Sequence, residues 1–599
     1  MINNAQYKIT FILLLAGLQT TFAQKKDENI GTEVVNVVKP YTPSISDAFK
    51  VKETPTLEDE ETTKKEEIKY TIFSFPVAST FTPSKGRAAS VDKTAQERLY
   101  KNYLTLGFGS YASANAELFI TENISNTDYV AGMLRHQSSQ GNIKDVKLDD
   151  KFYDTSLDLT YGSKQQNLSW NADLGYQHQV YNWYGLPEFF GFTLPEADQN
   201  ALIDGINPQQ TYHNFYLGGR VKANDSFFNE GSFKYNRFWD AYGSEENRFF
   251  IKPSLKFDVS DKAITANFTV DYLSTKFDKA FPDVDSPATP VFGNEHSYLT
   301  LGVNPNFQIL QDDLTLNLGA EIVYLSTLKN IVNGVDFDSD SDFFIYPTVT
   351  ASYKVVGDLM IAYAGAEGGL KQNSYRDFTN INPFVSPNLF IAPTDAQYDI
   401  YVGLKGKLSN AVSYNVRGSY LSEKNRALYL SNDYSEDIDN KNYVYGNSFN
   451  VVYDNMKTIS FFGELKADFS KNVAFGINGS FATYNNDLQE EAWNLPQIKL
   501  GTSLDVNITK KWFAGANVFF VGERMDLQFD KSSGAIGTDG MKTLDGYFDA
   551  NLNLGYKHNE RLTAFLKANN IANQAYEKWL NYPVQQFQLM LGASYKFDF

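Results

Sequence analysis

Alternation of apolar and polar side chains over the last thirteen residues constrains the fold of this chain most strongly. Apolar or aromatic side chains stand at every odd position from Phe587 to Phe599, and the even positions are polar or small except for Met590. Successive side chains of a strand point to opposite faces, so this segment has one apolar and one polar face. The same alternation recurs at 168–177, 314–324 and 548–557. Its carboxylates and amides need water, which predicts a barrel with a wet lumen and a lipid-facing exterior.

The first 23 residues have the composition of a cleaved secretory signal peptide. Lys8 supplies a positive charge, residues 9–18 an apolar core, and Thr21 to Ala23 a small-residue cleavage site before Gln24. The apolar core is too short to span a bilayer as a helix. The chain has no cysteine, which excludes a lipid-anchored lipoprotein, a disulfide framework and a thiolate site.

Residues 24–98 differ from the rest of the chain because charges and prolines are dense there, including the acidic run Glu58 to Glu61. This composition predicts a short, extended N-terminal segment in the periplasm. Residues 99–599 are predicted to form an all-β, transmembrane antiparallel barrel of about 22 strands. Ser448 to Phe469 is expected to be one long strand.

Connections of two lengths alternate along residues 99–599, as in bacterial outer-membrane barrels. Short periplasmic turns are expected at 162–165, 222–225, 260–262, 310–312, 409–410, 470–472, 509–511 and 557–560, and longer extracellular loops at 185–210, 280–295, 329–342, 376–395, 430–447, 529–543 and 574–585. The expected location is therefore the outer membrane, with its lipids and lipopolysaccharide as partners.

Composition also limits the chemistry. A net charge of −18 argues against nucleic acid, because phosphate binding needs a surplus of Lys and Arg. The five histidines show no metal-ligand spacing, and no Ser/His/Asp or paired-carboxylate arrangement stands out, so neither an enzyme nor a cofactor is predicted.

One loop contains a weak candidate for calcium. Asp336, Asp338, Asp340 and Asp342 alternate there, but Ser341 and Pro347 stand where an EF-hand loop needs Gly and Glu. A solvated acidic loop is the plainer interpretation, and divalent cations bridging it to lipopolysaccharide phosphates are a further one.

The densest aromatic patch lies at 181–192. It includes Trp183, Tyr184, Phe189, Phe190 and Phe192. These rings are interpreted either as an extracellular binding surface or as the upper aromatic girdle merging into a packed loop.

The segment Leu566 to Tyr576, Leu-Lys-Ala-Asn-Asn-Ile-Ala-Asn-Gln-Ala-Tyr, resembles the "x-N-N-hydrophobic-x-[ND]-x-x-Y" segment before the last strand of TonB-dependent receptors. The ending Tyr-Lys-Phe-Asp-Phe is similar to members from the Bacteroidetes. The resemblance implies uptake of a bulky nutrient, such as a metal chelate or an oligosaccharide, across the outer membrane. Because a barrel must pair its last strand to close, Tyr595, Phe597 and Phe599 are expected to be an insertion signal.

A candidate TonB box follows from the same resemblance. Glu33, Val34, Val35, Asn36, Val37 and Val38 form a β-prone segment, and Pro40 and Pro43 oppose helix formation behind it. Such a peptide adds a strand to a sheet edge of its periplasmic partner. An ordinary β-prone stretch, or a docking site for another protein, is the alternative.

Receptors of this family carry a longer plug domain with "I-R-G" and "D-G" patterns, which do not occur in residues 24–98. The N-terminal segment, a partner or the loops must then close so wide a lumen. Two functions stay open on this basis. The first is uptake coupled to TonB. The alternative is a non-transporting scaffold that docks periplasmic or surface partners through residues 30–52 and 69–83.

Overall fold

The computed structural model describes residues 98–191, 194–224, 226–259, 262–279, 293–433, 442–528 and 540–599. The predicted signal peptide, the TonB-box candidate Glu33 to Val38 and Phe192 lie outside these ranges. Among the described residues, no helix is long and apolar enough to cross a membrane.

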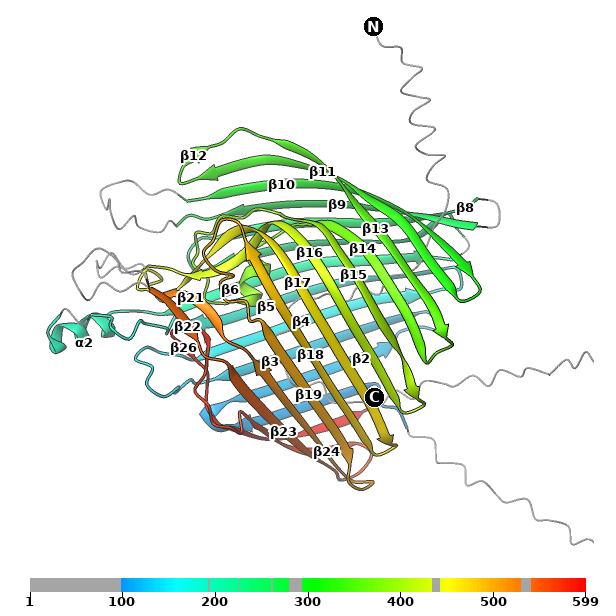
Figure 1. Ribbon diagram of the computed structural model, residues 1–599. Coiled ribbons are helices and arrows are strands. Elements are labelled where there is room, and N and C mark those ends of the chain that lie inside the picture. Colours follow the sequence, from blue (N-terminus) through cyan, green and yellow to red (C-terminus); the bar gives the residue numbers. More distant parts are fainter. Residues whose placement is uncertain are drawn as a thin grey trace, which may run out of the picture. The chain divides into compact units, whose positions relative to one another are not determined.

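Antiparallel strands form one closed barrel (Figure 1). Its sheet has 23 strands, of which β12 (Val335–Asp336) is a two-residue extension, so 22 build the wall. They are β1 (Asn102–Gly109), β2 (Ala114–Asn123), β3 (Asp128–Ser139), β4 (Phe152–Lys164), β5 (Leu168–Asn182), β6 (Gln209–Ala223), β7 (Phe228–Asp240), β8 (Glu245–Val259), β9 (Lys262–Lys276), β10 (Glu295–Gln311), β11 (Leu314–Val332), β13 (Ser341–Val356), β14 (Met360–Lys371), β15 (Thr394–Ser409), β16 (Val412–Ser431), β17 (Phe449–Ser470), β18 (Val473–Asn486), β19 (Ile498–Asn507), β20 (Trp512–Val521), β23 (Tyr547–Lys557), β24 (Leu562–Asn569) and β27 (Gln588–Phe597).

The first and last strands close the barrel. β27 pairs with β24 on one side and with β1 on the other, in a register that runs from Asn102 opposite Phe597 to Gly109 opposite Met590. No wall strand is left with a free edge, which a lipid environment requires.

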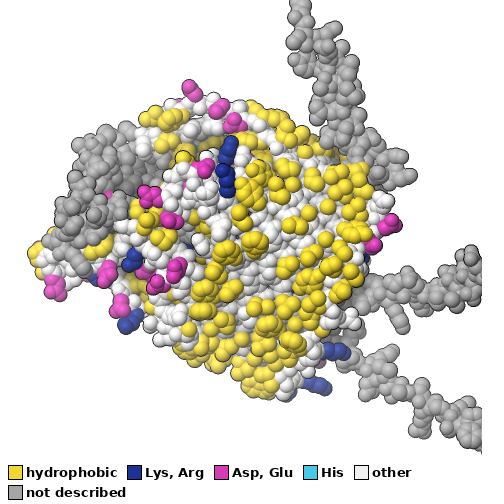
Figure 2. All heavy atoms as spheres, viewed as in Figure 1, with side chains coloured by type: hydrophobic (Ala, Val, Ile, Leu, Met, Phe, Trp, Pro, Cys, Tyr) yellow, Lys and Arg dark blue, Asp and Glu magenta, His cyan; other side chains and the backbone are white. Residues whose placement is uncertain are grey.

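The predicted alternation is realised on the outer wall. On β27, Leu589, Leu591 and Tyr595 are exposed, whereas Met590, Gly592 and Ser594 between them are partly buried. Figure 2 shows that hydrophobic side chains cover much of the visible wall, and that most of the visible acidic side chains lie towards the left end of the barrel. The fold class, an all-β transmembrane barrel of about 22 strands, is therefore confirmed.

Short and long connections alternate along the wall. Each of the eight predicted short turns falls between two consecutive wall strands, and two further short connections occur at 124–127 and 357–359. The long strand expected at 448–469 is β17. In Figure 1 the longer loops, with α2, β21 and β22, lie at the left, and the short turns lie at the right. These two ends are called the loop end and the short-turn end below.

The loops carry the remaining elements. They are η1 (Ser110–Ala112), α2 (Glu196–Asp204), α3 (Tyr375–Ile381), and the hairpins β21 (Arg524–Gln528) with β22 (Gly540–Leu544) and β25 (Glu577–Trp579) with β26 (Tyr582–Pro583). The three clusters of buried hydrophobic residues are built from these loops and from the loop-end halves of the strands. The core of this barrel therefore lies at one end of its lumen.

Candidate functional site: a closed loop end

Loop segments fold inward and meet across the loop end of the barrel. The segments 372–393, 442–448 and 577–583 are called the loop cap here. Val385, Leu389, Ile391, Tyr443 and Tyr582 of the cap are all at most 1% exposed. Because these side chains belong to three different loops, their joint burial requires the loops to pack on one another and on the wall.

Helix α3 crosses the lumen. Tyr375 at its start packs edge-to-face on Phe238 of β7, with ring centroids 5.3 Å apart. Phe378, one turn later, packs on Tyr429 of β16 at 6.1 Å. Seven wall strands, β8 to β11 and β13 to β15, lie between β7 and β16 on one side of the barrel order. Contact with both walls therefore places α3 across the lumen.

Local sequence explains why a helix forms within this loop. Ser374 is the N-cap, and its hydroxyl accepts a hydrogen bond from the backbone N–H of Asp377 at 3.1 Å. A Ser with an acidic residue three positions later is a good helix start, because the hydroxyl satisfies a free N–H group and the negative charge is stabilised by the helix dipole. The sequence contains this signal, although only a long extracellular loop is predicted for 376–395.

Strand β8 holds the start of α3. The carboxylate of Glu246, which is buried, accepts hydrogen bonds from the backbone N–H of Tyr375 at 2.5 Å and from the hydroxyl of Thr275 at 3.1 Å. Arg248 donates to Asp271 at 2.9 and 2.6 Å and to Asp377 of the helix at 3.3 Å. The wall thus binds α3 through its backbone and through an ion pair.

Wall tyrosines bind the backbone of the cap elsewhere. Tyr212 of β6 donates to the carbonyl of Pro383 at 2.8 Å, and Tyr298 of β10 to that of Ile391 at 2.7 Å. Tyr453 of β17 donates to the carbonyl of Phe390 at 3.0 Å. Buried carbonyl groups need such partners. The tyrosines therefore make it possible to bury an irregular segment inside the barrel.

A second anchor joins the cap to β17. Val385 forms a parallel β-bridge with Phe449, and the N–H of Ser386 donates to the carbonyl of Phe449 at 2.8 Å. From the last loop of the chain, the ring of Tyr582 stacks on Phe384 with centroids 3.8 Å apart. Its hydroxyl donates to the carbonyl of Asn447 at 2.6 Å.

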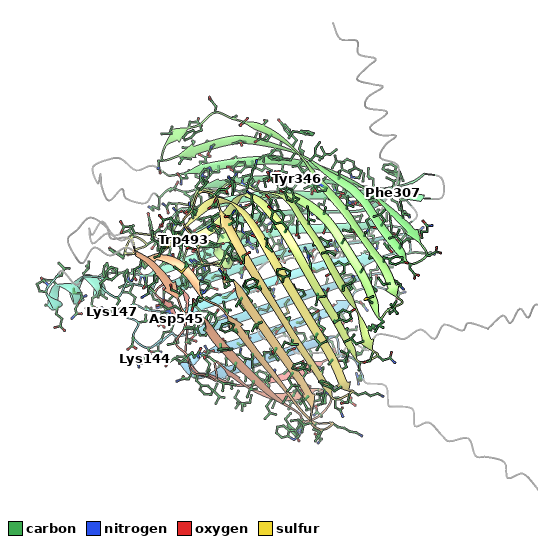
Figure 3. The ribbon with its side chains drawn as sticks, in the orientation of Figure 1. Lys144, Lys147, Phe307, Tyr346, Trp493 and Asp545 are labelled. Atoms are coloured by element: carbon green, nitrogen blue, oxygen red, sulfur yellow. The ribbon has the colours of Figure 1, made fainter. Side chains whose placement is uncertain are left out.

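The β21–β22 hairpin contacts the cap, because Arg524 of β21 donates to the carbonyl of Glu577 at 2.6 Å. Asp526 on β21 is fully buried and accepts hydrogen bonds from the N–H of Ser431 at 3.0 Å and from the side chain of Asn494 at 2.8 Å. Burial raises the pKa of Asp526 to about 6, because the charged carboxylate loses its hydration. Figure 3 shows the neighbouring Trp493 at the loop end, and Phe307 far from it towards the short turns.

The aromatic residues singled out in the sequence take part in this closure. Trp183 and Phe190 are fully buried, and Tyr184 packs on Phe384 and Tyr582. Phe189 packs against the same cluster as Phe190. These four rings form part of a packed loop, and their role in binding stays a prediction.

The other predicted site residues lie away from the cap. Asp336, Asp338, Asp340 and Asp342 are exposed around the β12 hairpin. No group of three or more His, Cys, Asp or Glu residues that could hold a metal occurs among the described parts of the chain. Tyr595 faces outward on β27, and the ring of Phe597 packs on both Tyr595 and Phe599.

No protein-family model matches the chain. No curated protein matches its sequence.

Solved structures match the barrel well despite low identity. The ferripyoverdine receptor of the outer membrane of Pseudomonas aeruginosa superposes with a TM-score of 0.60 at 12% identity, over 84% of this chain and 72% of that one. The FrpB iron transporter of Neisseria meningitidis superposes with a TM-score of 0.61 at 10% identity, over 84% of this chain and 82% of that one. For the ferric-catecholate import receptor Fiu of E. coli, the TM-score is 0.58 at 12% identity, over 84% of this chain and 82% of that one. The chain therefore has the barrel fold of outer-membrane import receptors.

Proposed function

We propose that this protein is an outer-membrane receptor of the TonB-dependent type that takes up a bulky nutrient, and that the loop cap is its gate. The observation that carries the proposal is the closure of an import-receptor barrel by its own loops at one end. A lumen as wide as that of a 22-stranded barrel would otherwise be a passage for solutes. A cap built from loops can close the passage and still move.

Buried polar atoms without hydrogen-bond partners in the cap also favour a movable gate. Gln372 Oε1, Asn382 Nδ2 and Asn388 Oδ1 are buried in the cap without a hydrogen-bond partner among the described residues. Each such atom costs roughly 1–3 kcal/mol relative to a satisfied one. An outward movement of the cap would let these groups bind water, which lowers the free energy needed to open it.

Energy for uptake is assigned to the segment Glu33 to Val38, which would add a strand to TonB from the periplasm. Outer-membrane lipids and lipopolysaccharide would surround the exposed apolar wall. The insertion signal is assigned to Tyr595, Phe597 and Phe599, because β27, which carries the first two and ends two residues before Phe599, closes the barrel.

A disulfide between cap and wall tests the gate. Val385 and Phe449 are bridge partners, so their Cα atoms are close enough for a disulfide after Val385→Cys and Phe449→Cys. The chain has no other cysteine. The bacterium lacking the native gene is complemented with this variant and grown with iron, phosphate or an oligosaccharide carbon source in limiting supply.

The proposal expects at least one medium in which the deletion strain grows poorly, wild type restores growth and the oxidised double variant does not. Each single-cysteine variant is the matched control and should restore growth, since it cannot cross-link. Full restoration by the oxidised variant in every such medium would contradict uptake through the gate. It would favour the scaffold, especially if a stoichiometric partner were recovered with the intact chain and lost without residues 24–95.

A further inference from the structure

Glycine and an aromatic ring face each other across neighbouring strands at six places on the inner wall. In each pair the ring lies so close over the glycine that a Cβ atom there would come within 2.0–2.4 Å of a ring atom. Glycine in a strand permits such an approach, and the ring compensates for its missing side chain. The pairs, each directly opposite in register, are Gly162–Tyr129, Gly175–Tyr216, Gly365–Tyr401, Gly403–Tyr363, Gly555–Phe513 and Gly592–Phe565.

A positively charged group lies over each of these six rings. The distances to the ring centroids are 5.3 Å for Lys164 over Tyr129, 4.4 Å for Lys234 over Tyr216, 5.2 Å for Lys405 over Tyr363, 3.8 Å for Arg417 over Tyr401, 5.7 Å for Lys557 over Phe513 and 4.6 Å for Lys567 over Phe565. All are within the range of cation–π attraction, about 6 Å. The inner wall thus repeats one three-layer unit: glycine, ring and cation.

Acidic groups lie near three of the six cations, Arg417, Lys234 and Lys567. Arg417 forms an ion pair with Asp399. Below Lys234, the hydroxyl of Tyr216 donates to Asp158 at 2.6 Å. Arg417 is therefore neutralised by an ion pair within the wall, and the carboxylates of Asp158 and Asp173 act electrostatically on Lys234.

The other four cations, Lys164, Lys405, Lys557 and Lys567, form no ion pair with any residue in the described ranges. Glu117 attracts Lys567 electrostatically without forming an ion pair with it, and its carboxylate accepts a hydrogen bond from Tyr103 at 2.5 Å. Four ammonium groups are thus held against rings of the inner wall without an ion-pair partner among the described residues.

Three of these lysines lie towards the short-turn end of the barrel, whereas Lys567 lies two residues before the loop-side end of β24. Lys164 and Lys557 are the last residues of β4 and β23, directly before short turns, and Lys405 lies near the end of β15. Lys567 lies on β24, where Phe513, Gly555, Phe565 and Gly592 form one row across four strands. A solute that moved along the lumen from the loop end to the short-turn end would pass all four.

We propose that Lys164, Lys405, Lys557 and Lys567 form an anion-binding surface in the lumen, and that the cargo is a compound with several acidic groups. The assignment of the bound anion as cargo rests on the proposed function, whereas the binding itself needs no transport. Rings that hold the ammonium groups reduce the entropy lost on binding. Several separate sites also let a ligand advance from one to the next instead of remaining at one.

The test measures the reactivity of single lysines in the full-length protein purified in detergent. Brief acetylation with acetic anhydride is quantified by mass spectrometry in the presence of citrate, tripolyphosphate or sucrose at equal ionic strength. Lys471 and Lys510 serve as controls, because they are exposed in turns at the same end and outside the lumen. The citrate and tripolyphosphate arms distinguish carboxylate from phosphate ligands.

The expected result is acetylation at least threefold slower at the four lumen lysines with citrate or tripolyphosphate, and unchanged rates at Lys471 and Lys510. Sucrose should have no effect. Equal slowing of the turn lysines, or none at the lumen lysines with either anion, would overturn the proposal.

A pair of double variants gives a second readout. Lys557→Gln with Lys567→Gln should weaken binding of the more protective anion at least tenfold in calorimetry. Lys471→Gln with Lys510→Gln should leave it unchanged, and heat-modified gel migration checks that both variants fold. Equal affinities would contradict the inference. The acetylation and calorimetry results do not depend on the outcome of the disulfide test. The anion-binding inference and the proposed function can therefore fail separately.

Discussion

The backbone N–H of Tyr375 donates to the carboxylate of Glu246 at 2.5 Å, although 129 residues separate the two along the chain. This contact joins the start of a loop helix to the inner face of the barrel wall. It is one of several by which the protein closes its loop end with its own loops. The predictions below follow from this closure and from the pairing of the strands.

Removal of Arg248 should loosen the cap. Arg248→Leu leaves Asp271 without its cation and takes away the ion pair with Asp377. A buried charge without a partner is strongly destabilising. We expect the backbone amides of α3 to exchange with deuterium at least about tenfold faster, which corresponds to about 1.4 kcal/mol.

Arg237→Leu is the matched control for that change. Arg237 pairs with Glu245 in the same β7–β8 hairpin, but both side chains are about half exposed. Exposed pairs contribute only about 0–1 kcal/mol. Equal acceleration of α3 exchange by both substitutions would show that Arg248 does not hold the cap.

Acidification should strengthen the docking of the β21–β22 hairpin. The pKa of Asp526 is raised to about 6 in the docked hairpin, so protonation favours the docked state. The stabilisation is complete below the ordinary pKa of an aspartate and is lost as the pH rises through about 6. Its full size would be roughly 3 kcal/mol, at 1.36 kcal/mol for each pKa unit.

Hydrogen exchange at Arg524–Gln528, corrected for the intrinsic effect of pH, measures this dependence. Protection should fall between pH 5 and pH 7 in the wild type, and Asp526→Asn should remove the change. The same pH dependence in Asp526→Asn would assign it to another group.

Loss of the last strand should abolish accumulation in the outer membrane. Deletion of residues 587–599 leaves both β24 and β1 without their partner. Two unpaired strand edges in lipid are not tolerated. Membrane fractionation should find no mature truncated protein in the outer membrane, and normal accumulation would refute this role of the strand.

Interruption of the TonB-box candidate should block uptake without affecting the barrel. Val35→Pro removes a backbone N–H that strand addition needs. Growth of the complemented strain should fall to that of the deletion strain in the medium identified by the disulfide test. Thr32→Pro, just outside the segment, is the control. Unimpaired growth with Val35→Pro would argue against energy coupling through this segment.

The sequence was sufficient to predict the wall but not the cap. Strand alternation is a local pattern, so segments such as 587–599 and the long β17 could be recognised directly. The turns at 124–127 and 357–359 are not predicted: Ile124 is an apolar residue within the first turn, and Gly357 follows the apolar pair Val355 and Val356. Neither omission changed the predicted number of strands.

Closure of the lumen depends on contacts that no local pattern contains. Tyr375 meets Glu246 and Asp240 only because the barrel brings β7 and β8 to the place where the β14–β15 loop turns inward. The glycine–ring–cation units depend in the same way on strand register. The sequence left the loops, the N-terminal segment and a partner as alternatives for closure, and the structure shows the loops closing one end.

Single-channel conductance in planar bilayers tests the closure most directly. A variant in which residues 374–391 are replaced by a short Gly-Ser linker loses α3 and the Val385 anchor. We expect the wild-type protein to stay closed, with brief openings at most, and the variant to conduct steadily through the wide lumen. Equal conductance of the two proteins, whether both closed or both open, would contradict closure of this barrel by its loop cap.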